Sequence, residues 1–444
     1  MHRETPISSA PTLLVAATAS GSGKTAITAA ILRALGRRGQ TVGGFKVGPD
    51  YIDPAFHRAA SGRPCPNVDP WAMRVATQTA ILEQAGLAVD LLIGEGVMGL
   101  FDGAADGTGA TADLAATLAI PVVLVVSARG MGASAAALIE GFCHHRADVA
   151  VVGVIFNRVN TDTHARLLRE ACAGRLSIPI LGFLPDDPAL TLPERHLGLV
   201  QAQELAGLDR QLDQAARLVE RHLDLPRLVR LARFPSVAAL PHRTAPLKPP
   251  GQRIALAEDA AFAFAYPSVL AGWRARGTEL LPFAPLADQP PDPDADAVYL
   301  PGGYPELHAA RLVGAGRFMS GLRAAAARGA AVYGECGGYM VLGEVLVDRD
   351  GQAQPMSGLL PVVTSFAKPR LHLGYRRVTS RHSSPLGLAG TVWRGHEFHY
   401  ASELEARGPR LFGLADARGE PRADAGCVLG RVCGSFVHLV DRAD

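Results

Sequence analysis

The chain has 444 residues, of which 48% are hydrophobic and 19% are charged, so it has ample apolar material for buried cores and little sign of disorder. Its formal net charge of +2 gives no reason to expect a nucleic acid or an anionic membrane as a partner. A chain of this length favours two or three domains over one.

Neither a membrane span nor an export signal is expected. The longest uncharged stretch near a predicted strand, residues 114–128, contains Pro121 and falls short of the roughly 20 apolar residues that a membrane-spanning helix needs. The N-terminal stretch MHRETPISSA has no apolar signal core. We therefore expect a cytoplasmic protein.

The N-terminal half alternates apolar strands with helical segments. An apolar run over 12–17 predicts a buried strand, and residues 24–39 have a helical period that ends at glycine. Further runs rich in Val or Ile follow at 41–47, 89–97, 120–128 and 149–159. Continuous apolar strands that alternate with helices are typical of a parallel sheet covered on both faces. Residues 1–231 are therefore predicted to form a doubly wound α/β domain.

The loop between the first strand and the first helix indicates a phosphate site. Residues 16–25 read AATASGSGKT, with Thr18 where the usual Gly-x-x-x-x-Gly-Lys-Thr pattern begins with glycine. Backbone N–H groups of such a loop point at phosphates, and a lysine adds positive charge. A Gly/Ser-rich turn without a ligand is the alternative. The predicted ATP-binding residues of this loop are Ser20, Gly21, Ser22, Gly23, Lys24 and Thr25.

Acidic residues follow two of the predicted strands. Glu95 and Asp102 follow one of them, and Asp50 and Asp53 follow another that carries Lys46, a predicted ATP contact. Mg²⁺ prefers oxygen ligands and typically uses one or two carboxylates together with phosphate oxygens. Asp beside Gly and Pro more commonly forms turns or caps. The predicted metal ligands are Thr25, Asp50 and Glu95.

Two further residues have open roles in the N-terminal half. Asn157 stands just past a predicted strand, where its amide could read an adenine edge or form a turn; we predict an ATP contact. His196 lies in a loop-like stretch, and a substrate role and a structural role are equally open.

A proline-rich stretch separates the two halves. Residues 232–252 have no clear period and predict a linker. A second α/β pattern follows over 253–444, with apolar runs at 253–259, 277–286, 295–303 and 329–344. We predict two α/β domains joined by the linker.

Cys336 stands in the sequence GECGG, after an apolar strand and before a helix-like run. This arrangement is that of a nucleophile elbow, in which a sharp turn exposes the side chain and the helix N-terminus favours the thiolate. His438, near the C-terminus, is the predicted base. A small buried residue is the alternative for Cys336. The predicted oxyanion-hole residues are Gly302, Gly303 and Gly337.

Other cysteines and histidines give weaker signals. The six cysteines contain no Cys-x-x-Cys pair, so neither a disulfide framework nor a zinc site is expected. Residues 395–400 read GHEFHY and suggest a strand whose histidines have either a structural or a substrate-contacting role.

Taken together, these segments resemble the cobyrinic acid a,c-diamide synthase family of corrinoid biosynthesis. The resemblance covers nearly the whole chain, in the family's order. It rests on TASGSGKT (18–25), FKVGPDYIDPAFH (45–57), NVDPWAM (67–73), GEGVMGLFDG (94–103), LPERHLGL (192–199), LPGGYPELHA (300–309), GECGGYM (334–340) and GHEFHY (395–400).

The resemblance implies a P-loop domain similar to dethiobiotin synthetase, followed by a class I glutamine amidotransferase domain. It implies that ATP, with Mg²⁺, phosphorylates a substrate carboxylate and that ammonia released from glutamine at Cys336 attacks the acyl phosphate. The implied substrate is hydrogenobyrinic or cobyrinic acid, amidated at its a and c side chains. The chain is rich in Ala, Arg and Gly, a composition that suggests a GC-rich aerobic bacterium and so favours hydrogenobyrinic acid, the cobalt-free substrate. The substrate-side residues would be Asp50, Tyr51, Asp53, Asp102 and His196.

The chain departs from the common amidotransferase triad at one position. The triad has Glu two residues after the histidine, where this chain has Val440, so the third member is open and a Cys–His dyad would suffice. A nickel-sirohydrochlorin a,c-diamide synthase or a cobyric acid synthase is an alternative, and a partitioning-type ATPase switch is a remote one. Monomer and homodimer are both open.

Overall fold

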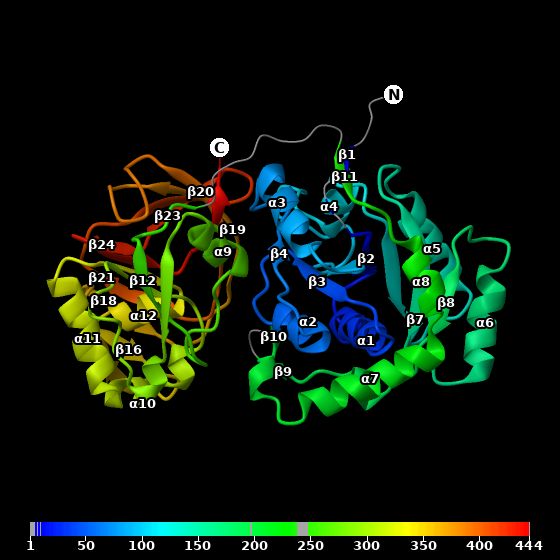
Figure 1. Cartoon of the computed structure of the whole chain (residues 1–444), viewed down its shortest axis with the longest axis horizontal. Coiled ribbons are helices and arrows are strands. Elements are labelled where there is room, and N and C mark those ends of the chain that lie inside the picture. Colours follow the sequence, from blue (N-terminus) through cyan, green and yellow to red (C-terminus); the bar gives the residue numbers. More distant parts are fainter. Residues whose placement is uncertain (1–4, 7, 9, 196–197, 238–246, 444) are drawn as a thin grey trace. The chain divides into compact units, whose positions relative to one another are not determined.

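The computed structural model describes residues 5–6, 8, 10–195, 198–237 and 247–443. The chain divides into two compact units, one of Met1–Trp71 with Val75–Arg243 and the other of Ala72–Arg74 with Thr244–Asp444 (Figure 1). Part of the segment predicted as a linker belongs to the first unit: Arg233 pairs with Thr12, and β11 (Ser236–Val237) pairs antiparallel with β1 (Thr5–Pro6). His196 lies outside the described residues.

A seven-stranded parallel sheet forms the centre of the first unit, in the order β4-β3-β5-β2-β6-β7-β8. The predicted strand over 12–17 is β2, with the same bounds. The strands are β2 (Thr12–Ala17), β3 (Val42–Val47), β4 (Asn67–Val68), β5 (Leu91–Glu95), β6 (Val122–Ser127), β7 (Val151–Asn157) and β8 (Ile180–Phe183), with a hairpin of β9 (Glu194–Arg195) and β10 (Gly198–Leu199).

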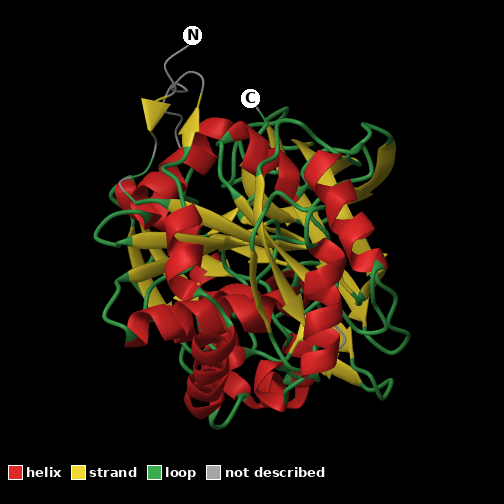
Figure 2. Cartoon of the chain, turned by 90° about the vertical axis from the view of Figure 1, so that its right-hand side faces the viewer, coloured by secondary structure: helices red, strands yellow, loops and turns green. Residues whose placement is uncertain are grey.

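Helices cover both faces of this sheet. Figure 2 shows the helices of the chain in red and its strands in yellow. Alternate residues of β2 enter two separate apolar clusters: Leu14 and Ala16 face one, and Leu13 and Val15 face the other. The first cluster includes residues of α3 (Val75–Ala85), α4 (Thr111–Thr117), α5 (Ser134–His144) and α6 (Asp162–Cys172). The second includes residues of α1 (Lys24–Arg37), α2 (Asp53–Ser61), α7 (Leu208–His222) and α8 (Leu225–Leu231), and short 3₁₀ turns lie at Pro188–Leu190 and Ala202–Glu204.

The second unit is built on a six-stranded sheet in the order β13-β12-β14-β15-β25-β24, in which only β24 is antiparallel. Its strands are β12 (Arg253–Ala257), β13 (Glu279–Phe283), β14 (Ala297–Leu300), β15 (Ala331–Glu335), β24 (Cys427–Leu429) and β25 (Val432–Ser435). Its helices are α9 (Pro267–Ala275), α10 (Ala309–Gly314), α11 (Gly316–Ala327) and α12 (Gly337–Leu342), with 3₁₀ turns at Pro285–Ala287 and Pro305–Leu307.

Two further sheets complete the second unit. A four-stranded sheet has the order β17-β16-β18-β21, and a five-stranded antiparallel sheet has the order β23-β22-β19-β20-β26. Their strands are β16 (Val345–Val347), β17 (Ala353–Pro355), β18 (Val362–Ser365), β21 (Ser402–Ala406), β19 (His372–Ser380), β20 (Val392–His399), β22 (Phe412–Ala415), β23 (Pro421–Ala425) and β26 (His438–Arg442). The two α/β units confirm the predicted fold class. Among the described residues, no helix is long and apolar enough to cross a membrane.

Candidate functional site

The glycine loop joins β2 to α1, and two of its glycines have a left-handed backbone. Gly21 and Gly23 have φ of 73° and 90°, a left-handed region that favours glycine. A Cβ on Gly23 would lie 2.6 Å from Nδ2 of Asn157, so there is no room for a side chain at this position. Asn157 donates from Nδ2 to the carbonyl of Ser22 at 2.9 Å. The end of β7 therefore supports the loop that precedes α1.

Lys24 lies at the start of α1 with its ammonium group inside the unit. Its Nζ donates to the carbonyl of Met98 at 2.6 Å, and the residue is 7% exposed. Burial lowers the pKa of Lys24, while the nearby Glu95 carboxylate opposes that shift. The loop after β5 thus holds the predicted phosphate-binding lysine.

Two carboxylates meet the Thr25 hydroxyl. Oγ1 of Thr25 lies 2.7 Å from Oε1 of Glu95 and 3.2 Å from Oδ2 of Asp53. Nζ of Lys46 lies between the same carboxylates, 2.8 Å from Oδ2 of Asp53 and 3.1 Å from Oε1 of Glu95. These four side chains come from α1, β3, β5 and the start of α2, because the ends of parallel strands meet at one edge of the sheet.

The charges of this cluster stabilise one another. Burial by itself raises the pKa of Glu95, but Lys46 and a hydrogen bond to His57 outweigh it and lower the pKa to about 2. Burial by itself lowers the pKa of Lys46, but the charges of Asp53 and Glu95 outweigh it and raise the pKa above its usual value. The cluster therefore contains a lysine cation and a carboxylate anion at neutral pH.

His57 is a residue of this cluster that the sequence reasoning missed. Its Nε2 lies 2.6 Å from Oε2 of Glu95, and the residue is fully buried. The signal was present, because His57 follows Asp53 by four residues and so lies on the same face of α2. His57 leaves Oε1 of Glu95 to face Thr25 and Lys46.

Asp50 lies close to the cluster but has another local partner. Its Oδ1 accepts from the backbone N–H groups of Ile52 and Asp53 at 2.8 and 3.0 Å, at the start of α2. Burial first, and then the charge of Asp53, raise the pKa of Asp50 to about 7. Of the two aspartates, Asp53 is the one that lies against Thr25.

The remaining predicted residues of the first unit lie in loops. Asp102 is exposed and accepts from the N–H of Gly99 at 2.9 Å, which closes a turn. Tyr51 is partly buried beside Asp50, and Ser20 is exposed before Gly21. Within the described part of the chain, no group of three or more His, Cys, Asp or Glu residues could hold a metal ion. A metal at Thr25 would therefore need oxygen atoms from a ligand as well.

Cys336 forms a sharp turn between β15 and α12 in the second unit. Its φ of 48° and ψ of −106° are rare for a residue with a side chain, and its own N–H is held by the carbonyl of Ser435 at 2.8 Å. A Cβ on Gly334 would lie 2.7 Å from the backbone of Gly338, so the strand and the helix approach closely. This geometry is that of a nucleophile elbow.

His438, the first residue of β26, lies next to Cys336. A Cβ on Gly302 would lie 2.6 Å from Cε1 of His438 and 3.2 Å from Cβ of Cys336, so these three residues pack together. A Cβ on Gly337 would lie 3.1 Å from the backbone nitrogen of Gly303. The structure thus brings the predicted nucleophile, base and oxyanion-hole glycines to one place.

The electrostatics of His438 depend on its neighbours. Burial lowers the pKa of its imidazole, but a hydrogen bond and the charge of Cys336, followed by Glu335, raise it to about 9. Nδ1 of His438 lies 3.6 Å from Oε2 of Glu335. An imidazolium beside a thiolate is the arrangement that activates a cysteine nucleophile.

The histidines of GHEFHY lie on β20, the strand that the sequence suggested. The ring of His396 stacks on His438 with centroids 5.0 Å apart, and Nε2 of His396 lies 2.6 Å from the hydroxyl of Tyr266. Burial, then His438, hold the pKa of His396 well below its usual value. Nδ1 of His399 lies 2.8 Å from the carbonyl of Ala401. His396 is therefore a neutral neighbour of His438.

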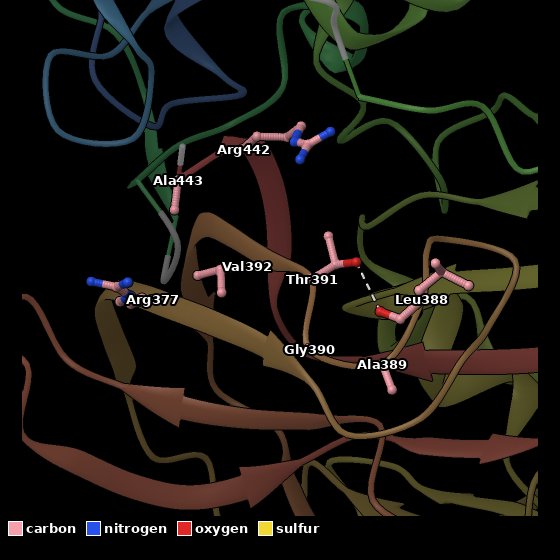
Figure 3. Close-up of a pocket in the computed structure, with 8 residues that line it drawn as sticks. All are labelled: Arg377, Leu388, Ala389, Gly390, Thr391, Val392, Arg442 and Ala443. Atoms are coloured by element: carbon pink, nitrogen blue, oxygen red, sulfur yellow. Dashed lines mark hydrogen bonds between the residues drawn. The ribbon is translucent and has the colours of Figure 1, made fainter.

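A surface cavity of about 380 Å³ lies elsewhere in the second unit (Figure 3). The Thr391 hydroxyl donates to the carbonyl of Leu388 at its edge, at 2.8 Å. Neither Cys336 nor His438 lines it. Its lining residues are Arg377, Leu388, Ala389, Gly390, Thr391, Val392, Arg442 and Ala443.

Comparisons with known proteins cover both units. Residues 13–200 match a CobQ/CobB/MinD/ParA nucleotide binding domain, and residues 253–444 match a CobB/CobQ-like glutamine amidotransferase domain. The chain is 54% identical over 440 residues to the hydrogenobyrinate a,c-diamide synthase of Brucella abortus, which covers 96% of this chain and 98% of that protein. The proteins of the same name from a Sinorhizobium species and Rhodobacter capsulatus are 53% and 51% identical, covering 97% and 96% of this chain and 99% and 98% of their own lengths.

Proposed function

The chain belongs to the family of hydrogenobyrinate a,c-diamide synthases, and we propose that it amidates the a and c side-chain carboxylates of hydrogenobyrinic acid with ATP and glutamine. The observation that carries the proposal is that these relatives match nearly the full length of the chain, including both the phosphate loop and the elbow at Cys336. The enzyme is thus a glutamine-dependent ligase of cobalamin biosynthesis.

The first unit activates the carboxylate. The backbone N–H groups of the glycine loop bind the ATP phosphates, and Lys24 adds a positive charge beside them. The terminal phosphoryl group of ATP moves to a substrate carboxylate oxygen, which forms an acyl phosphate and releases ADP. Asp50, Tyr51, Asp102 and His196 lie in the segments that we propose for contacts with the macrocycle, and Lys46 and Asn157 support the ATP side.

The residues around Thr25 fit a magnesium ion. They offer one hydroxyl and two carboxylates, the oxygen donors that Mg²⁺ prefers, and the ammonium of Lys46 already lies against both carboxylates. Thr25, Asp53 and Glu95 would hold the ion, with nucleotide oxygens completing its ligands. Asp53 takes the place of Asp50, which the sequence predicted as the ligand, because Asp53 lies against Thr25 whereas Asp50 accepts from the backbone at the start of α2. Bound there, Mg²⁺ would offset the negative charge of the transferring phosphoryl group.

The second unit releases ammonia. The Cys336 thiolate attacks the side-chain carbonyl carbon of glutamine, and the backbone N–H groups near Gly303 and Gly337 stabilise the oxyanion. His438 gives its proton to the leaving nitrogen, so ammonia departs and a thioester remains. Water then hydrolyses the thioester, with His438 as base, and glutamate leaves. Ammonia displaces phosphate from the acyl phosphate and forms the amide.

The experiment combines the purified protein with ATP, Mg²⁺, glutamine and hydrogenobyrinic acid. Mass spectrometry counts the amides, because each one replaces a hydroxyl by an amino group, and fragmentation locates them. We expect a diamide with glutamine, and Cys336→Ala should retain only the reaction with ammonia. Amidation of a cobalt or nickel macrocycle in place of this acid would overturn the substrate, and a wild-type protein without glutaminase activity would overturn the function. A partitioning-type ATPase has no use for the amidotransferase domain over 253–444.

A further inference from the structure

The residue that precedes the nucleophile lies behind the base. Oε2 of Glu335 lies 3.6 Å from Nδ1 of His438, within ion-pair distance. Val440, two residues after His438, has an apolar side chain and offers no acceptor. Glu335 lies at the end of β15 and His438 at the start of β26, so a carboxylate reaches the imidazole from a different strand than in the common triad.

Three donors hold the Glu335 carboxylate in place. The hydroxyl of Tyr299 donates to Oε2 at 2.8 Å, and the hydroxyl of Tyr333 donates to Oε1 at 2.6 Å. The N–H of Leu439 also donates to Oε1, at 3.2 Å. Tyr299 and Tyr333 pair in register on β14 and β15, and their rings stack with centroids 5.5 Å apart. A side chain that accepts from three donors is suited to the ionised form, which has no proton to donate.

The tyrosines stay protonated donors. Burial first, and then the charge of Glu335, raise the pKa of both Tyr299 and Tyr333 well above the usual value. A buried carboxylate with this many hydrogen bonds is also fixed in orientation, since rotation of its plane would break them. Glu335 is 4% exposed and His438 is 1% exposed, so little solvent screens the charge between them.

Among the described residues, three titratable groups are in contact with His438. Cys336 hydrogen-bonds to the imidazole, Glu335 faces Nδ1, and the neutral ring of His396 stacks against one face with Tyr266 behind it. Of these, only Glu335 is a carboxylate. It is therefore the group that can balance a positive imidazole while the other nitrogen serves the thiol.

We infer that Glu335 is the positioning carboxylate of the Cys336–His438 site, binding Nδ1–H of the imidazole and directing Nε2 toward the sulfur. The inference rests on the proposed function, because it takes Cys336 as the nucleophile that attacks glutamine. The distance of 3.6 Å is long for a hydrogen bond, and such contacts tighten when substrate binds. A carboxylate in this place fixes the tautomer of the base and stabilises the imidazolium that forms during the reaction.

The variant that tests this role is Glu335→Gln. The amide oxygen can still accept from Tyr333 and Leu439, and its NH₂ group would face Tyr299, whose hydroxyl can rotate to accept. The same NH₂ group would also face Nδ1 of His438 and favour the tautomer with the proton on Nε2. We expect kcat for glutamine hydrolysis to fall by about 100-fold, since a positioned acid–base group contributes about 10²–10⁴-fold.

The pH profile separates positioning from packing. Without the negative charge, the pKa of His438 should fall, so the alkaline limb of glutamine hydrolysis should move to lower pH by about 1 to 3 units. Tyr333→Phe is the matched control, because it removes one donor to the carboxylate and keeps the charge. It should leave the alkaline limb in place. Ammonia-dependent amidation in the first unit should be unchanged in both variants.

Each result decides the inference. Glutamine hydrolysis within about threefold of wild type in Glu335→Gln, less than the smallest contribution of such a group, would overturn it. The inference would also be overturned if Glu335→Gln lost no more glutamine hydrolysis than Tyr333→Phe and its alkaline limb did not move. If Glu335→Gln does not fold, Glu335→Asp takes its place: we expect lower turnover with the alkaline limb retained, and wild-type turnover would contradict the role. A wild-type protein that does not hydrolyse glutamine would instead refute the proposed function.

Discussion

Nε2 of His57 lies 2.6 Å from Oε2 of Glu95, and both side chains are buried. The contact fixes one oxygen of a carboxylate whose other oxygen faces Thr25 and Lys46. Nδ1 of His57 is buried without a hydrogen-bond partner among the residues that the structure describes, so the ring contributes one bond only. His57 of α2 therefore orients Glu95 at the end of β5, beside Thr25.

His57→Ala should impair amidation with either nitrogen source and spare glutamine hydrolysis. The change leaves Oε2 of Glu95 buried without its donor, which should lower the free energy of unfolding by about 1–3 kcal/mol. Denaturant unfolding and ammonia-dependent amidation measure the two effects. His57→Gln is the control, because its amide nitrogen can replace Nε2 and should restore much of the activity. Wild-type amidation by His57→Ala would refute the role.

Gly23→Ala should weaken ATP binding more than Gly21→Ala does. Both glycines have a left-handed backbone, which costs an L-residue roughly 1–2 kcal/mol. Only at Gly23 would the new methyl group also meet Nδ2 of Asn157, at 2.6 Å; at Gly21 nothing lies within 4 Å. Isothermal titration with ATP compares the pair. Equal losses of affinity would show that the contact with Asn157 does not matter.

Asp53→Asn and Asp50→Asn should differ in their demand for Mg²⁺. Asp53 lies against Thr25, whereas Asp50 accepts from the backbone at the start of α2. An amide keeps an acceptor for those N–H groups but loses the charge that binds a cation. We expect Asp53→Asn to raise the Mg²⁺ concentration for half-maximal amidation by about tenfold or more, because a neutral amide oxygen is a weaker Mg²⁺ ligand than a carboxylate and changes around a metal site typically cost about 10–100-fold in metal affinity. The opposite ranking of the two variants would point to Asp50 as the ligand.

Glutamine hydrolysis should fall as the pH rises through about 9. Burial lowers the pKa of His438, but Cys336 and Glu335 raise it to about 9, so the imidazolium is present below that pH and is lost above it. Protonation of His438 also stabilises the folded state, and this contribution is lost as the pH rises through the folded-state pKa of about 9. Initial rates of glutamine hydrolysis, measured across alkaline pH, define the alkaline limb of the pH–rate profile. In Cys336→Ala, the histidine NMR titration should move to lower pH, because the main group that raises the pKa is gone.

Local patterns predicted the elements well. The Val- and Ile-rich runs gave the strands, and β2 has the predicted bounds, because a continuous apolar run before a glycine loop has few other ways to be buried. The segment over 232–252 was harder. Its prolines suggested a linker, but backbone pairing of Arg233 with Thr12 ties its beginning to the first unit, and this pairing depends on a partner more than 200 residues away.

The site residues also divide into those set by a local motif and those set by contacts distant in the sequence. Cys336 and Lys24 stand in motifs whose backbone shape is local, so their places could be predicted. The contact of Asn157 with Ser22 depends on the strand order of one sheet, in which β6 separates β2 from β7. The contact of Glu335 with His438 joins strands of two different sheets, and a single sequence reveals neither arrangement. Asn157 was expected at an adenine edge; its amide holds the loop itself, and the contact with the base stays a prediction.

Lys46 has a consequence for how the carboxylates behave in a metal-free buffer. Its ammonium lies 2.8 Å from Asp53 and 3.1 Å from Glu95, and it is attached to the central sheet. The buried Glu95 carboxylate and the partly buried Asp53 carboxylate would repel each other and loosen the start of α2 if their only counter-ion came from solution. Here the counter-ion is a covalent part of β3, so dialysis against a chelator cannot take it away.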